Sequence, residues 1–239
     1  MPLYSYTKVN KSRKHRVKKN APLLSAVFMS IGLLIIGWVI YPILSFELFY
    51  APKFTGLIQP IPGEIIKDTI SQNLPQVLGA DNTDYTKASV WFPKAERIQT
   101  ITDNSSYYLS IPKVGVEQAT VLTGSDDLSK SLIQFTGPLP GNNGNTVIFG
   151  HSTLLWFYNP KDYKAIFSKL PELIIGDEII INVDNITYRY KVMDMRVVSP
   201  TDFSVLDQDF DGQNLTLITC VPPGTYLKRL AIHAKLDNI

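Results

Sequence analysis

Residues 214–236 read NLTLITCVPPGTYLKRLAIHAKL, and this stretch decides the fold. Apolar and polar side chains alternate up to Cys220, as they do along a β-strand, and the alternation resumes at Arg229. Between the two runs, the Pro-Pro-Gly sequence at 222–224 interrupts strand pairing and is typical of a turn. The stretch predicts an antiparallel hairpin in which the end of one strand lies beside the start of the next. Cys220 and Arg229 are then neighbours.

Short β-rich runs separated by turn residues continue upstream as far as Tyr107. Besides the two strands of the hairpin they are YYLSIP, GVEQATVL, NTVIFG, DEIIINV and ITYRYKVMDMRVV. Residues 159–170, NPKDYKAIFSKL, are an exception and predict a short helix that begins at the Asn-Pro pair. About seven or eight strands at hairpin-like spacing predict one all-β barrel or sandwich with a real core.

A long uncharged stretch near the N-terminus predicts a membrane anchor. No charged residue occurs between Lys19 and Glu47, and APLLSAVFMSIGLLIIGWVIY, as a helix, crosses the roughly 30 Å hydrocarbon core. Seven Lys and Arg residues precede residue 20, so the positive-inside bias predicts a cytoplasmic N-terminus and an extracytoplasmic remainder. The alternative is a cleaved signal peptide, whose apolar run is normally shorter, and no convincing small-x-small cleavage site precedes Tyr41.

These signals divide the chain into four parts. They are a basic cytoplasmic arm (1–20), a single transmembrane anchor (21–46), a stalk (47–106) and the β-domain (107–239). Several prolines indicate an extended stalk, and GEIIKDTISQNLPQVLG at 63–79 predicts one helix within it.

Composition and charge exclude several classes of protein. At 45% hydrophobic and 18% charged the chain is neither disordered nor collagen-like, and its single cysteine excludes a disulfide scaffold. The basic arm lacks aromatic interleaving and any binding motif, so its charge is explained by membrane topology and nucleic acid is not an expected partner. CxxC, HExxH and glycine-rich phosphate-loop motifs are absent, and we expect neither a metal nor an organic cofactor.

Cys220 is the first candidate for chemistry. A solitary cysteine in an exported domain is buried and inert, joined to another chain, or reactive. Its place at a strand end next to a turn is where reactive groups are commonly displayed. A neighbouring Arg229 favours the thiolate and can donate two hydrogen bonds to a developing oxyanion. The alternative interpretation is that Arg229 is a surface arginine on an edge strand.

A thiol with an ordinary pKa near 8.5 needs a neighbouring imidazole or cation to become a nucleophile near pH 7. His15 lies in the basic arm, which leaves two histidines. His151 directly follows NTVIFG and stands at a strand end, whereas His233 lies within a strand, where a structural or solvent-facing role is expected. Both histidines are possible bases for Cys220, and the position of His151 at a strand end favours it.

The histidine, the cysteine and the arginine, in this order along the chain and after an N-terminal anchor, resemble the sortases. Sortases are the membrane-anchored cysteine transpeptidases of bacterial surfaces. The family's TLxTC signature stands at 216–220, its catalytic histidine in its GH context at Gly150-His151, and its arginine at Arg229. The similarity covers about residues 107–235. The resemblance implies a closed eight-stranded sortase barrel with short helices and a groove that binds a sorting peptide, often of the LPxTG type.

The resemblance also implies the site. Its catalytic residues are His151, Cys220 and Arg229, and within the signature we assign substrate binding to Thr219 and Leu217. No Asp-Pro-aromatic lid motif precedes the barrel, although Trp-Phe-Pro at 91–93 occupies comparable ground, so a lidded pilin-polymerising subclass is not assigned.

The sequence thus predicts an extracytoplasmic cysteine transpeptidase at the cell membrane. Its partners are a sorting-signal peptide of a surface protein and an amine of the cell envelope or of a pilin-like subunit. Two alternatives stay open, namely an endopeptidase in which water resolves the thioacyl enzyme, and a non-enzymatic anchored β-domain with Cys220 packed in its core.

Overall fold

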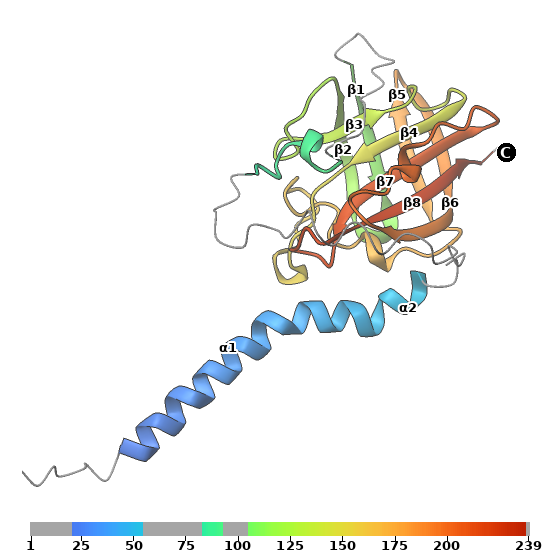
Figure 1. Ribbon diagram of the computed structural model, residues 1–239. Coiled ribbons are helices and arrows are strands. Elements are labelled where there is room, and N and C mark those ends of the chain that lie inside the picture. Colours follow the sequence, from blue (N-terminus) through green and yellow to red (C-terminus); the bar gives the residue numbers. More distant parts are fainter. Residues whose placement is uncertain (1–20, 55–82, 93–104, 238–239) are drawn as a thin grey trace, which may run out of the picture. The chain divides into compact units, whose positions relative to one another are not determined.

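The computed structural model describes residues 21–54, 83–92 and 105–237, and it divides the chain into two compact units, Met1–Tyr41 and Pro42–Ile239 (Figure 1). Helix α1, Ala21–Phe49, is long and apolar enough to cross a membrane, and α2, Ala51–Phe54, follows it. The helix is therefore a candidate membrane anchor. The helix expected at 63–79 lies outside the described residues.

Eight strands among the described residues form a closed barrel in the order β1-β2-β3-β4-β7-β8-β6-β5, and β5 pairs with β1 to close it (Figure 1). The strands are β1 (Ser106–Ile111), β2 (Val116–Thr123), β3 (Leu132–Thr136), β4 (Gly144–Phe149), β5 (Glu178–Val183), β6 (Ile186–Val198), β7 (Gln213–Val221) and β8 (Lys228–Leu236). The connections and the segment before β1 contain short 3-10 turns, η2 (Ala88–Val90), η3 (Pro112–Val114), η4 (Leu155–Phe157), η5 (Leu170–Glu172) and η6 (Ser204–Leu206).

The barrel confirms the predicted fold class. Each β-rich run forms a strand, and β7 and β8 form the predicted antiparallel hairpin with Cys220 opposite Arg229. Strand β3, LIQFT, was not among those runs, and all five of its residues are buried, including the polar side chains of Gln134 and Thr136. Not every pair of adjacent strands in the barrel is antiparallel, as it would be in hairpins. Strands β2 and β3 run parallel, and so do β4 and β7.

The predicted helix at 159–170 is wrong. The stretch forms consecutive turns that lead into η5, and the backbone hydrogen bonds within it join residues three apart. The N–H of Phe167 donates to the carbonyl of His151 at 2.9 Å, so it is not available to the i−4 carbonyl that an α-helix requires. The side chains of Asn159 and Asp162 accept hydrogen bonds from backbone N–H groups two residues on, which favours turns over a helix.

Two hydrophobic clusters of the described residues lie on opposite faces of the strands. One fills the barrel interior and includes Leu217 of β7, which has no exposed surface, together with Phe46 of α1. The other covers the outer face of β4, β7 and β8 and contains Ile218 and Cys220, with Val205 of η6 packed over them. Cys220 therefore lies on the outside of the barrel beneath other segments of the chain.

The first prediction concerns the inner cluster. Leu217→Ala should lower the free energy of unfolding by about 2–5 kcal/mol, because it opens a cavity among fully buried side chains. Leu227→Ala is the matched control, since Leu227 is 60% exposed and its loss should change stability by no more than about 0.5 kcal/mol. Urea unfolding of the full chain in detergent measures both, and equal stabilities of the two variants would contradict the packing described for Leu217.

Candidate active site

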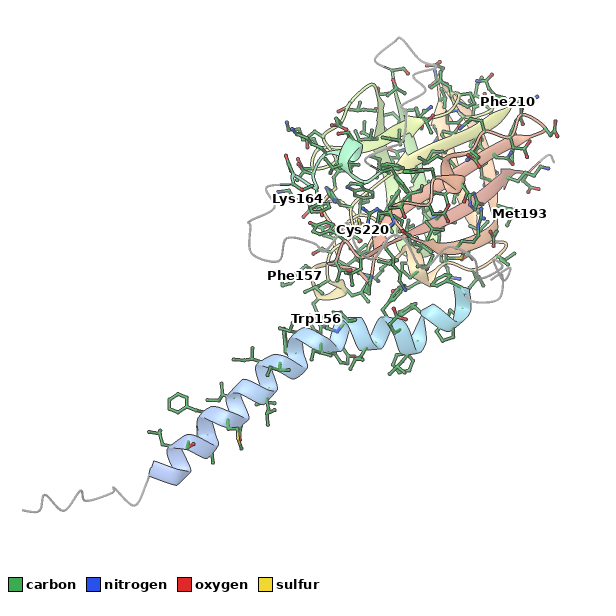
Figure 2. All side chains as sticks on the ribbon, in the orientation of Figure 1. Trp156, Phe157, Lys164, Met193, Phe210 and Cys220 are labelled. Atoms are coloured by element: carbon green, nitrogen blue, oxygen red, sulfur yellow. The ribbon has the colours of Figure 1, made fainter. Side chains whose placement is uncertain are left out.

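The ends of β4 and β7 bring His151 beside Cys220. The two strands are parallel neighbours, so their chains leave the barrel at the same edge. Beyond the last strand pair, the N–H of Gly150 donates to the carbonyl of Ile218 at 3.1 Å, and Oγ of Ser152 donates to the carbonyl of Cys220 at 2.6 Å. The segment that carries His151 therefore runs alongside the segment that carries Cys220. Figure 2 shows Cys220 at this end of the barrel.

Arg229 approaches from β8, directly opposite Cys220, and is only 2% exposed. Its Nη1 donates to the carbonyl of Tyr226 at 3.1 Å and its Nη2 to the carbonyl of Trp91 at 3.2 Å. Its Nε is buried and has no hydrogen-bond partner among the described residues. Backbone carbonyls thus hold a buried guanidinium beside the thiol, and its positive charge favours the thiolate.

A segment upstream of the barrel, residues 83–92, packs over this site as a cover, and its Ala88, Trp91 and Phe92 belong to the same buried cluster as Cys220. Trp91 has no exposed surface, and its ring lies edge-on to the ring of His151 with 5.4 Å between their centres. The same ring lies 5.4 Å from the guanidinium carbon of Arg229. Two backbone hydrogen bonds of 2.8 and 2.9 Å tie the segment to the β2–β3 connection. Trp91 is the first residue of the Trp-Phe-Pro run that we noted in the sequence on ground comparable to a lid motif, but its packing over His151 and Arg229 was not predicted.

Burial sets the protonation of Cys220 and His151. Desolvation lowers the pKa of His151 to about 4, and the positive charge of Lys164 adds to this effect. Desolvation raises the pKa of Cys220 to about 11, with Arg229 opposing the rise. A thiolate–imidazolium pair requires the reverse order of pKa values, so near pH 7 the covered site holds a neutral thiol and a neutral imidazole.

His151 also has an unsatisfied ring nitrogen. Its Nε2 is buried and has no hydrogen-bond partner among the described residues, and the residue is 7% exposed. Leaving a buried polar atom without a partner costs about 1–3 kcal/mol, and a catalytic role is one of the reasons for which native proteins retain such an atom. A reacting group that enters the site would supply this bond.

Thr219 and Leu217 lie on the other face of β7 from Cys220. Oγ1 of Thr219 donates to the carbonyl of Gly150 at 2.8 Å and so ties β7 to the residue that precedes His151. Leu217 packs in the barrel interior, and neither side chain has exposed surface. In this structure both side chains support β7 on the face opposite Cys220. From the sequence we expected them to contact substrate.

His233 lies farther along β8, opposite Thr216. The hydroxyl of Thr216 donates to Oδ1 of Asn145 at 2.7 Å, so Nδ1–H of His233 donates to that hydroxyl at 2.9 Å. Nε2 of His233 then accepts from Nη2 of Arg196 at 2.7 Å. Desolvation and Arg196 lower the pKa of His233 to about 4. Both ring nitrogens are engaged in a fixed network, which gives His233 a structural role.

Known proteins are similar in sequence to the barrel. The family model described as "Sortase domain" matches residues 109–237, more than half of the chain. Sortase D of Bacillus subtilis (strain 168) is 27% identical over 139 residues, a match that covers 56% of this chain and 65% of that relative. The chain thus spans slightly less than two thirds of the length of this curated relative.

Solved structures are similar to the barrel as well. A lid mutant of sortase A from Corynebacterium diphtheriae is 27% identical, with a TM-score of 0.50 over 60% of this chain and 75% of that chain. A sortase D5 transpeptidase from Clostridium perfringens is 29% identical, with a TM-score of 0.47 over 57% of this chain and 80% of that chain.

The second prediction concerns the cover. Trp91→Ala should admit water to Cys220 and lower the pKa of its thiol, and each unit of lowering raises the thiolate fraction near pH 7 about tenfold. Alkylation of the full chain by iodoacetamide should therefore accelerate about tenfold or more, and its pH midpoint should move to lower pH. Mass spectrometry measures the rate. Trp156→Ala, which removes an exposed tryptophan, should leave the rate unchanged, and a parent-like rate in Trp91→Ala would show that the cover does not control the thiol.

Proposed function

Because the chain belongs to the sortase family, we propose that its barrel is a cysteine transpeptidase whose reacting groups are Cys220, His151 and Arg229. Family membership supports transpeptidase chemistry in general. The observation that carries the assignment of residues is the convergence of a cysteine, a histidine and an arginine from the ends of β7, β4 and β8.

In the first half of the proposed reaction, the thiolate of Cys220 attacks the carbonyl carbon of a residue in an LPxTG-like sorting signal. The guanidinium of Arg229 donates hydrogen bonds to the oxyanion that develops. His151, as imidazolium, gives its proton to the leaving amine as the peptide C–N bond breaks. The products are a released amine and a thioacyl enzyme that joins the sorting signal to Cys220.

In the second half, an amine of the cell envelope or of a pilin-like subunit attacks the thioester carbonyl. Neutral His151 accepts a proton from this amine, a new amide bond forms, and the C–S bond breaks. The thiolate of Cys220 and the imidazolium of His151 are regenerated, so one turnover exchanges one amide bond for another.

The contacts of Arg229 in the covered site support its proposed role. Its Nη2 already donates to a peptide carbonyl, that of Trp91, at 3.2 Å, and its Nε has no partner among the described residues. A substrate carbonyl that takes the place of the Trp91 carbonyl would accept a hydrogen bond from Nη2 of Arg229, and Nε would be a second donor nearby. The fork of the guanidinium suits such a paired contact.

Substrate and cover compete for the same space. Trp91 contacts both His151 and Arg229, so a peptide carbonyl that reaches Cys220 displaces residues 83–92 from the site. Displacement removes the desolvation that makes the thiol and imidazole neutral, and it brings their pKa values closer together. Activation of the nucleophile is therefore coupled to exchange of the cover for substrate.

The proposed location is the cell membrane. The apolar helix α1 is a candidate anchor, and the basic residues that precede it favour an N-terminus in the cytoplasm. This orientation puts the barrel outside the membrane, where surface proteins with sorting signals and envelope amines occur.

The third prediction tests the assignment of residues. Incubation of the full chain in detergent with a sorting-peptide library and candidate amines should give ligated peptides by mass spectrometry. Cys220→Ala should abolish the product, and His151→Ala should be nearly as damaging because it removes the proton carrier, whereas His233→Ala should retain turnover wherever it folds. Equal loss in both histidine variants, with circular dichroism showing both folded, would contradict the assignment. Release of the free acid in place of ligated peptide would identify an endopeptidase.

The fourth prediction separates charge from geometry at Arg229. Arg229→Lys keeps the positive charge but replaces a planar fork of donors by one flexible ammonium. If Arg229 donates to the oxyanion, kcat/KM should fall by about 10²-fold or more, as on loss of one preorganised donor. Alkylation of Cys220 by a small reagent should fall much less, because it depends mainly on thiolate availability. A parallel fall in both rates, or unchanged turnover, would remove Arg229 from the proposed role.

A further inference from the structure

The end of the barrel that carries Cys220 also carries exposed apolar side chains on three loops, which we call the apolar rim. It consists of Leu155, Trp156 and Phe157 of η4, Ile174 and Ile175 before β5, and Leu227 before β8, with exposures between 42% and 69%. Single exposed apolar residues are common on protein surfaces, whereas several gathered at one end mark an interaction site. Figure 2 shows Trp156 and Phe157 at this end.

Strand pairing and contacts hold the rim together. The loops follow β4 and precede β5 and β8, which the closed barrel order places at the same end. A Cβ on Gly224 would lie 3.0 Å from the side chain of Leu154, so the chain before η4 touches the β7–β8 turn. The hydroxyl of Tyr158, just after η4, donates to η3, whose Lys113 pairs at 3.3 Å with Asp177, two residues after the isoleucine pair.

The chain that leads from the candidate anchor joins the barrel near the rim. Oε1 of Glu47 lies 3.7 Å from Nζ of Lys228, the residue that follows Leu227 of the rim, and Phe46 is buried in the barrel core. Five residues lead from Tyr41, the last residue of the first unit, to Phe46. A fully extended chain spans at most about 3.6 Å per residue, so the apolar span ends within about 18 Å of Phe46 whatever its direction.

We propose that the apolar rim docks into the interfacial layer of the lipid bilayer that holds α1. This inference rests on the proposed membrane anchor. Tryptophan favours this layer because one part of its ring system is apolar and its N–H seeks water or headgroups, and Phe, Leu and Ile bury their side chains at its acyl boundary. The exposed cations Lys161 and Lys164, which follow η4, suit anionic headgroups beside it.

Tethering makes this docking favourable even for a small apolar surface. The anchor converts insertion of the rim into an intramolecular event with a high effective concentration, so weak intrinsic partitioning suffices. Docking would hold the end of the barrel that contains Cys220 against the membrane surface and would fix the height of the site above the lipid.

Trp156 is the reporter for the experiment. The full chain carrying Trp38→Phe keeps Trp91, which is buried, and Trp156, which is 53% exposed. It is reconstituted into vesicles of phosphatidylcholine and phosphatidylglycerol with or without bromine on the upper acyl carbons. Emission that is absent after Trp156→Phe in the same background belongs to Trp156. Flotation of the vesicles first reports whether the chain is anchored.

Docking predicts that brominated lipid reduces the Trp156 emission by about twofold or more, since interfacial residues lie about 5–10 Å into the headgroup and acyl boundary. Aqueous iodide should quench Trp156 less in vesicles than in the same chain in detergent. The matched control is Phe210→Trp in the chain that lacks Trp38 and Trp156. Phe210 is 65% exposed and lies just before β7, at the other end of the barrel, so a tryptophan there should respond to iodide and not to bromine.

Each other outcome overturns the proposal in a distinguishable way. A chain that does not float contradicts the anchor and the docking together, whereas a chain that floats without quenching by bromine contradicts the docking alone. Protection of Trp156 that appears only with added sorting peptide would assign the rim to substrate, and protection that depends on protein density would assign it to a second copy. Quenching by bromine without peptide ligation would leave the docking standing and contradict only the proposed transpeptidase.

Discussion

The parallel pairing of β4 with β7 is the constraint on which the candidate site depends. Parallel neighbours end at the same edge of a sheet, so Gly150 and Ser152 reach the backbone of Ile218 and Cys220 through hydrogen bonds of 3.1 and 2.6 Å. The antiparallel partner β8 then starts where β7 ends and supplies Arg229. Without this pairing, the strand ends that carry His151 and Cys220 would not lie side by side.

Burial determines the chemical state of the site. The aromatic cover excludes water from His151 and Cys220, and desolvation moves their pKa values apart, to about 4 for His151 and about 11 for Cys220. Arg229 favours the thiolate but does not outweigh desolvation while Trp91 lies over the site. The covered state is therefore neutral, and in the proposed reaction a substrate that takes the place of Trp91 would give a state suited to nucleophilic attack.

The two ends of the barrel differ in character. The end with Cys220 carries the proposed reacting groups and the apolar rim, and the contact between Glu47 and Lys228 joins the last turn of α1 to it. Farther along β8, the outer face is polar, with His233 held between Arg196 and Thr216.

The sequence by itself determined the features that depend on local pattern. Alternation with a period of two identified seven strands, and the Pro-Pro-Gly turn placed Cys220 opposite Arg229, because both signals act between near neighbours in the chain. The family resemblance added His151, and the same period of two places Leu217 on the opposite face of β7 from Cys220. Only the tertiary structure decided what long-range contacts control. These are the parallel pairings, the fully buried strand β3, and the turns at 159–170. In those turns the N–H of Phe167 donates to the carbonyl of His151 and not to the carbonyl that an α-helix would use. The cover over the site belongs with them, because the burial of Trp91 arises from contacts with strands that follow it in the sequence.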